Sequence, residues 1–69
     1  MTEIQSLARG LRILEILAES PNGVSVTDLA AQLDLDKGSA SRLVSTLANY
    51  AYAEKDAISR RYFLGPQVV

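Results

Sequence analysis

Five small or positively charged residues between positions 37 and 45 are spaced so that one face of a helix carries them together. They are Lys37, Gly38, Ser41, Arg42 and Ser45, and steps of three and four residues place side chains on the same side of an α-helix. The guanidinium of Arg42 suits the O6 and N7 atoms of guanine, to which it can donate two hydrogen bonds, whereas serine hydroxyls discriminate less between bases. This face predicts contact with duplex DNA, and Arg42 is the strongest candidate for contacting a base.

Four further residues are candidates for contacting the DNA backbone. Thr27 and Ser39 stand at predicted helix starts, where hydroxyls and backbone amides commonly hold phosphate oxygens. Arg60 and Arg61 stand near the tip of a predicted hairpin, from which long cations reach the minor groove or the backbone. Because neighbouring side chains of a strand point in opposite directions, we expect one of the two arginines to point away from this surface.

The first predicted helix, residues 6–19, is apolar around much of its circumference. Its leucines are expected to be internal, while Ile13 and Ile16 lie off their line and are candidates for contact with a second copy. The apolar residues that recur at helical steps are Leu7, Leu11, Leu14 and Ala18. Such spacing is typical of an amphipathic helix.

Two further helices are predicted after a turn at residues 20–23. Ser25, three residues before Asp28, fits a capping pattern that starts a short second helix ending near Asp34. Asp36 can cap a third helix that runs from Lys37 to about residue 50. The second and third helices, joined by a three-residue turn, predict a helix-turn-helix.

A hairpin closes the predicted domain. Residues 52–54 and 61–64 have the composition of two short strands. The aromatic residues at this junction are expected to belong to the core and not to a base-stacking platform; they are Tyr50, Tyr52, Tyr62 and Phe63. The expected fold is mainly α with a small β-hairpin, a winged helix-turn-helix of three helices plus a wing, in one domain over residues 1–69.

Composition excludes most other classes of function. The chain has 69 residues with no cysteine and no histidine, so disulfides, thiol and imidazole nucleophiles and Cys/His metal sites are absent. The glycine spacing of a phosphate-binding loop is also absent, and a chain of this size has little room for a substrate pocket. We expect no enzymatic activity, no metal and no cofactor. Without a long apolar run or a signal peptide, we expect a cytoplasmic protein that contacts no membrane.

The net charge of −1 hides an asymmetry between the two halves of the chain. Residues 1–36 hold two basic and six acidic side chains, whereas residues 37–69 hold five basic and two acidic ones. A basic face on a nearly neutral body is therefore expected. The alternative is a winged helix that contacts another protein without binding DNA, and the acidic first half favours that alternative.

Several segments, in this order and spacing, resemble the DNA-binding domain of the isocitrate-lyase-regulator (IclR) family of bacterial transcription regulators. Residues 5–15 (QSLARGLRILE) resemble the first helix of that family, and residues 62–66 (YFLGP) its last strand and exit. Leu29-Ala30 and residues 39–43, which include Arg42, match its second and third helices. Ala51 stands where the family usually has glycine, so a strained helix cap is expected there.

The resemblance implies a partner and a missing region. Family members dimerise, partly through the first helix, on a roughly palindromic operator in double-stranded DNA. They continue past the Gly65-Pro66 exit into a linker helix and a C-terminal domain that binds a small organic effector. We therefore expect this chain to be the DNA-binding part of a longer regulator, a homodimer with no effector site of its own.

Overall fold

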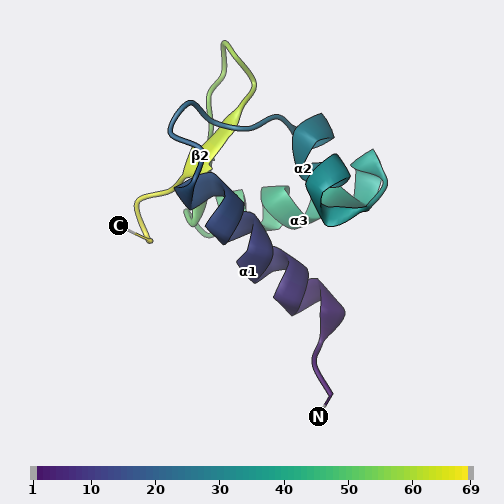
Figure 1. The fold of residues 1–69 in the computed structure, drawn as a ribbon. Coiled ribbons are helices and arrows are strands. Elements are labelled where there is room, and N and C mark those ends of the chain that lie inside the picture. Colours follow the sequence, from purple (N-terminus) through teal and green to yellow (C-terminus); the bar gives the residue numbers. More distant parts are fainter. Residues whose placement is uncertain (1, 69) are drawn as a thin grey trace.

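Three helices and a hairpin follow one another along the chain. In the computed structural model, which describes residues 2–68, the helices are α1 (Gln5–Ala18), α2 (Val26–Leu33) and α3 (Lys37–Asn49). Strands β1 (Ala53–Lys55) and β2 (Tyr62–Leu64) form an antiparallel pair. Figure 1 shows the hairpin loop projecting at one end of the molecule and α1 extending from the body toward the N-terminus at the other. The predicted winged helix-turn-helix is confirmed.

Helix capping explains why the second and third helices begin and end close to the predicted residues. The N–H of Asp28 donates to the Ser25 hydroxyl oxygen at 3.1 Å, so Ser25 starts α2 as predicted. The helix is ended by Asp34, whose φ of 57° places it in the left-handed region that aspartate tolerates better than most residues. Asp36 then caps α3. Because each cap depends on residues a few positions apart, the sequence pattern predicts where these helices begin and end.

The buried face of α1 differs from the predicted one. Ile13, Ile16 and Leu17 are buried, whereas Leu7 and Leu11 are 61% and 56% exposed. The assignment that made the leucine stripe internal and left Ile13 and Ile16 for a second copy is therefore wrong.

The error has a physical cause in the two apolar stripes of α1. Periodicity shows that a helix has an apolar side, but two overlapping stripes fit the same period. The C-terminal half of α1 packs on α2, α3 and β2, which enclose Ile13 and Ile16, while its N-terminal half extends past them (Figure 1). Leu14 is half-buried, and the leucines before it have few neighbours.

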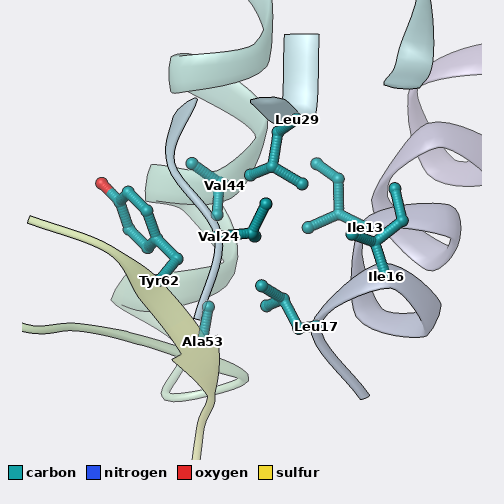
Figure 2. Packing of buried hydrophobic residues seen from close by; sticks show 8 residues of the cluster. All are labelled: Ile13, Ile16, Leu17, Val24, Leu29, Val44, Ala53 and Tyr62. Carbon is teal, nitrogen blue, oxygen red and sulfur yellow. The ribbon is translucent and has the colours of Figure 1, made fainter. Parts of the chain in front are cut away.

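Eight buried side chains form one core to which every helix and strand contributes. Figure 2 shows Ile13, Leu17, Val24, Leu29 and Val44 close together, with Ala53 and Tyr62 on the hairpin side of this group and Ile16 on the α1 side. Ile13, Leu29 and Val44 are completely enclosed. Burying an aliphatic side chain of this size contributes about 1.5–3 kcal/mol, so a chain this short depends on each of them.

The aromatic residues divide between core and surface. Tyr62 is 5% exposed and Phe63 is half-buried, as expected of core residues. Tyr50 and Tyr52 are 70% and 41% exposed, so their assignment to the core is wrong. The cause is the sharp reversal of the chain after α3, which turns both side chains outward before β1 begins.

Backbone pairing attaches the hairpin to the segment that precedes α2. Within the hairpin, Ala53 pairs with Leu64 and Lys55 with Tyr62. Tyr62 also pairs with Val24 on its other side, through two N–H···O bonds of 2.9 and 3.0 Å. The strands lie within one residue of their predicted positions. The added Val24 pair fixes the wing relative to the start of α2.

Ala51 ends α3 in the conformation that glycine usually adopts. Its φ is 65°. Its N–H donates to the Ala48 carbonyl at 3.0 Å, and the N–H of Tyr52 donates to the Leu47 carbonyl at 2.9 Å, which is the pattern of a Schellman cap. A side chain in the left-handed region costs roughly 1–2 kcal/mol. The strain expected from the sequence is therefore present.

Replacing Ala51 by glycine is expected to stabilise the domain. Relief of the left-handed strain outweighs the extra entropy of glycine in the unfolded chain, which leaves a gain of about 0.5–1 kcal/mol. Urea unfolding followed by far-UV circular dichroism measures the difference. Ala31→Gly, at an exposed position inside α2, is the control and should lose about 0.5–1 kcal/mol. If Ala51→Gly is no more stable than the wild type, the left-handed conformation of Ala51 does not strain the fold.

Candidate nucleic-acid interface

The turn between α2 and α3 is fixed by short hydrogen bonds at both ends. After the left-handed Asp34, the N–H of Leu35 donates to the Ala30 carbonyl at 2.9 Å. The Asp36 carboxylate then accepts from the Ser39 N–H at 2.9 Å and from the Ser39 hydroxyl at 2.7 Å. The direction of α3 relative to α2 is therefore set by backbone geometry and one capping side chain.

Hydrogen bonds at the start of α3 favour the ionised form of Asp36. The hydrogen bonds from the Ser39 side chain and backbone lower the pKa of its carboxyl below the ordinary value of 3.8. A negative charge at this position is favoured by the dipole of α3, although it repels any phosphate close to the helix start. Because the Ser39 hydroxyl already donates to Asp36, it must leave that partner before it can donate to a phosphate.

The predicted contact face of α3 is accessible along its length. Lys37, Gly38 and Arg42 are exposed, and Ser41 and Ser45 are half-buried. The opposite side of the helix holds Ala40 and Val44, both completely buried. The structure therefore brings together the five residues that the spacing placed on one face.

A shallow hollow beside this face brings in a residue of α1 that sequence reasoning missed. Arg9 lines it together with Ser39 and Arg42, and its volume is about 260 Å³. Thr46 also lines it and donates its hydroxyl proton to the Arg42 carbonyl at 2.8 Å. Arg9 lies four and seven residues before Ile13 and Ile16, so the correct buried face of α1 indicates its place beside α3.

A second hollow is lined by residues of both the helix-turn-helix and the wing that were predicted to contact DNA. Thr27, Lys37 and Arg60 line it, and its volume is about 210 Å³. Lys55 lines it as well.

Arg61 is not part of this group. Its guanidinium Nη1 donates to the Asn22 carbonyl at 3.4 Å, over the turn between α1 and α2. Arg60, whose φ is 62°, lines the second hollow instead. The two neighbouring arginines therefore serve different surfaces, and only Arg60 joins Thr27 and Lys37.

The cations of these surfaces have no acidic partner in the described part of the chain. Among residues 2–68 the one ion pair joins Arg12 to Glu15 within α1, at 3.3 Å. The charges of Arg9, Lys37 and Arg42 are therefore available to an external anion.

Other kinds of site find no support in residues 2–68. The described residues contain no group of three or more potential metal ligands. No helix among them is both long and apolar enough to cross a bilayer.

Fold and surface together define a winged helix-turn-helix DNA-binding domain. Residues 6–57 match the IclR helix-turn-helix domain, and the chain belongs to the IclR family of bacterial transcription regulators. The family consists of regulators and not of enzymes, in agreement with the composition. Membership also favours DNA binding over the alternative of a protein-contact module.

Relatives and solved structures support this assignment. The chain is 36% identical over 66 residues to the glycerol operon regulatory protein of Streptomyces coelicolor and 38% identical over 53 residues to the transcriptional repressor IclR of Escherichia coli. These alignments cover 96% and 77% of the chain but 26% and 19% of the relatives. An IclR transcriptional regulator from Alicyclobacillus acidocaldarius superposes with a TM-score of 0.91 at 29% identity, over 99% of this chain and 28% of that one. The chain thus spans between 19% and 28% of the length of these proteins.

The capping of α3 makes a prediction about acid stability. Because folding lowers the pKa of Asp36, its carboxylate stabilises the fold above the ordinary pKa of an aspartate, and this stabilisation is lost as pH falls through the lowered folded value. In Ser39→Ala the pKa of Asp36 should rise back toward 3.8, and stability should depend less on pH in that window. Carboxyl NMR titration measures the pKa, and urea unfolding at several pH values measures how stability depends on pH.

Asp56 provides the internal control for this titration. Hydrogen bonds from the backbone and side chain of Ser59 lower its pKa, and Ser39 does not contact it. Its pKa should not change in Ser39→Ala. An unchanged pKa for Asp36 in that variant would mean that the cap does not depend on the Ser39 side chain.

Proposed function

We propose that this domain binds operator DNA in the cytoplasm by placing α3 in the major groove. The observation that carries the proposal is the exposed Arg42, which has no ion pair within residues 2–68 and lies among the small residues Gly38, Ser41 and Ser45 of the same face. An α-helix with short side chains fits the width of the major groove, about 12 Å. Arg42 would then contact guanine, and Ser41 and Ser45 would add less selective hydrogen bonds.

In this proposal, contacts with the DNA backbone hold α3 in register in the groove. Gly38 has no side chain to separate the start of α3 from the DNA, while Lys37 and Thr27 face the same side as the wing. The wing brings Arg60 to flanking DNA, and Ser39 and Arg61 require rearrangement before they can bind phosphate. Phosphate contacts supply affinity without sequence preference.

A dimer is proposed on the evidence of the exposed leucines of α1. Leu7 and Leu11 line an apolar hollow of about 440 Å³ that reaches across to Leu43 and Leu47 of α3. Covering this surface with a second copy would place two recognition helices on one side of the DNA. Such pairs bind half-sites one helical turn apart on a roughly palindromic operator.

We further propose that residues 1–69 are the DNA-binding part of a longer regulator. The small share of each relative that the chain covers supports this proposal. An effector would then bind in a C-terminal domain outside these residues and act by changing the distance or orientation of two DNA-binding domains. The 69-residue chain should therefore bind DNA without responding to a small molecule.

Arg42→Ala is expected to reduce both affinity and sequence preference. On a duplex selected by the wild type from a random pool, the loss should be about 1–3 kcal/mol, with a smaller loss on unselected duplex. Fluorescence anisotropy at about 50 and 200 mM salt measures both values.

Arg12→Ala is the matched control, because this arginine is paired within α1 and lines neither basic hollow. It should bind like the wild type. Absence of wild-type binding at low salt would overturn the proposed function, and equal losses in both variants would overturn the role of Arg42.

Leu11→Gln is expected to weaken self-association without unfolding the domain. The side chain is 56% exposed, and glutamine is a good helix former, so the core should be unchanged. Sedimentation velocity should show association at least about tenfold weaker, and binding to a two-half-site duplex should lose cooperativity. Arg12→Gln, also on α1, should keep both. Unchanged association of Leu11→Gln would place the dimer contact elsewhere.

A further inference from the structure

Three cations from separate parts of the chain meet at the hollow between the helix-turn-helix and the wing. Lys37 belongs to the start of α3, Lys55 to the end of β1 and Arg60 to the hairpin loop. The complete lining is Ser25, Val26, Thr27, Lys37, Lys55, Ser59 and Arg60. The hollow is small, about 210 Å³, which suits a compact anion better than a base or a peptide.

The local charges leave this hollow without a negative partner from the described residues. None of the three cations forms an ion pair within residues 2–68. Three acids, Asp36, Glu54 and Asp56, are next in sequence to Lys37 and Lys55, and none of them lines the hollow. The Asp36 carboxylate accepts the Ser39 N–H at 2.9 Å, and the Asp56 carboxylate accepts the Ser59 N–H at 2.7 Å. Like charges held around one concavity repel one another, so an external anion placed among them relieves that repulsion.

Contacts within the fold place Lys55 and the main chain of Arg60 at the hollow. Lys55 Nζ lies 5.6 Å from the centre of the Tyr62 ring, a distance at which the ring attracts the ammonium group. Arg60 is held by its N–H, which donates to the Asp56 carbonyl at 2.8 Å. The Ser25 hydroxyl accepts the Asp28 N–H, and its own proton remains available to an oxygen acceptor. The hollow thus presents both charge and a directed donor.

We propose that this hollow binds a single backbone phosphate of the DNA duplex and that Lys55 is an additional phosphate-binding residue. The inference rests on the proposed function and adds a definite stoichiometry, one phosphate shared by three cations of three segments. A shared phosphate ties the wing and the helix-turn-helix to the same point on the DNA. Three separate contacts would impose no such relation.

Salt dependence distinguishes one shared phosphate from three separate ones. Each neutralised phosphate contributes about −0.9 to the slope of log affinity against log salt. Replacing Lys37, Lys55 and Arg60 together by glutamine should reduce the magnitude of the slope by about 0.9, and not by about 2.7. Lys55→Gln alone should weaken duplex binding about 3- to 10-fold at low salt, with Arg12→Gln as the unaffected control.

Neutral methylphosphonate linkages, introduced singly along the duplex, locate the phosphate. One linkage should weaken wild-type binding and have little effect on the variant that lacks all three cations. All three side chains are exposed, so thermal unfolding should show that the variants are folded. The inference is overturned if Lys55→Gln binds like the wild type, or if the magnitude of the salt slope of the triple variant falls by about 2.7. It is also overturned if every linkage weakens the wild type and the triple variant equally.

Titration with inorganic phosphate separates a DNA phosphate from a free anion. The amide NMR signals of Lys37 and Ser59 should move only at high phosphate concentration. Saturation below about 1 mM would assign the hollow to a free anion and overturn the inference. Wild type that binds no duplex overturns the proposed function and this inference together, whereas duplex binding that ignores Lys55 overturns this inference alone.

Discussion

The backbone pair between Val24 and Tyr62 is the constraint on which the arrangement of the binding surface depends. It joins β2 to the residue before the Ser25 cap, so the wing and the start of α2 move as one unit. Both residues are also buried in the core, where loss of the two hydrogen bonds would leave unsatisfied backbone groups at a cost of about 1–3 kcal/mol each. Arg60 therefore lies beside Thr27 and Lys37 because of main-chain geometry.

Most of the fold could be predicted from the sequence because its elements are specified locally. The caps at Ser25 and Asp36 and the strained Ala51 each depend on a few neighbouring residues. The buried face of α1 could not be predicted, since two apolar stripes fit one period and only contact with α2, α3 and β2 selects between them. The exposed Tyr50 and Tyr52 were misplaced for a related reason, because the turn after α3 decides where they point.

The candidate site divides in the same way. The face that contains Arg42 follows from helical spacing alone, once the opposite side is known to be buried. Arg9 enters through contacts between elements distant in sequence, which no local pattern contains, and contacts of the same kind place Lys55 beside Lys37. The alternation of side chains indicated that one of the two adjacent arginines points away from the surface, but not that it is Arg61, whose carbonyl partner at Asn22 is 39 residues away.

The outer face of α3 contributes almost nothing to the stability of the domain. The side chains of Lys37, Ser41 and Ser45 form no hydrogen bond or ion pair with another described residue, and the hydrogen bond of Arg42 uses its main-chain carbonyl. Exchanging these side chains therefore costs little folding free energy. For the proposed contact of α3 with operator DNA, this means that a few substitutions can change the preferred DNA sequence while the scaffold beneath the surface stays the same.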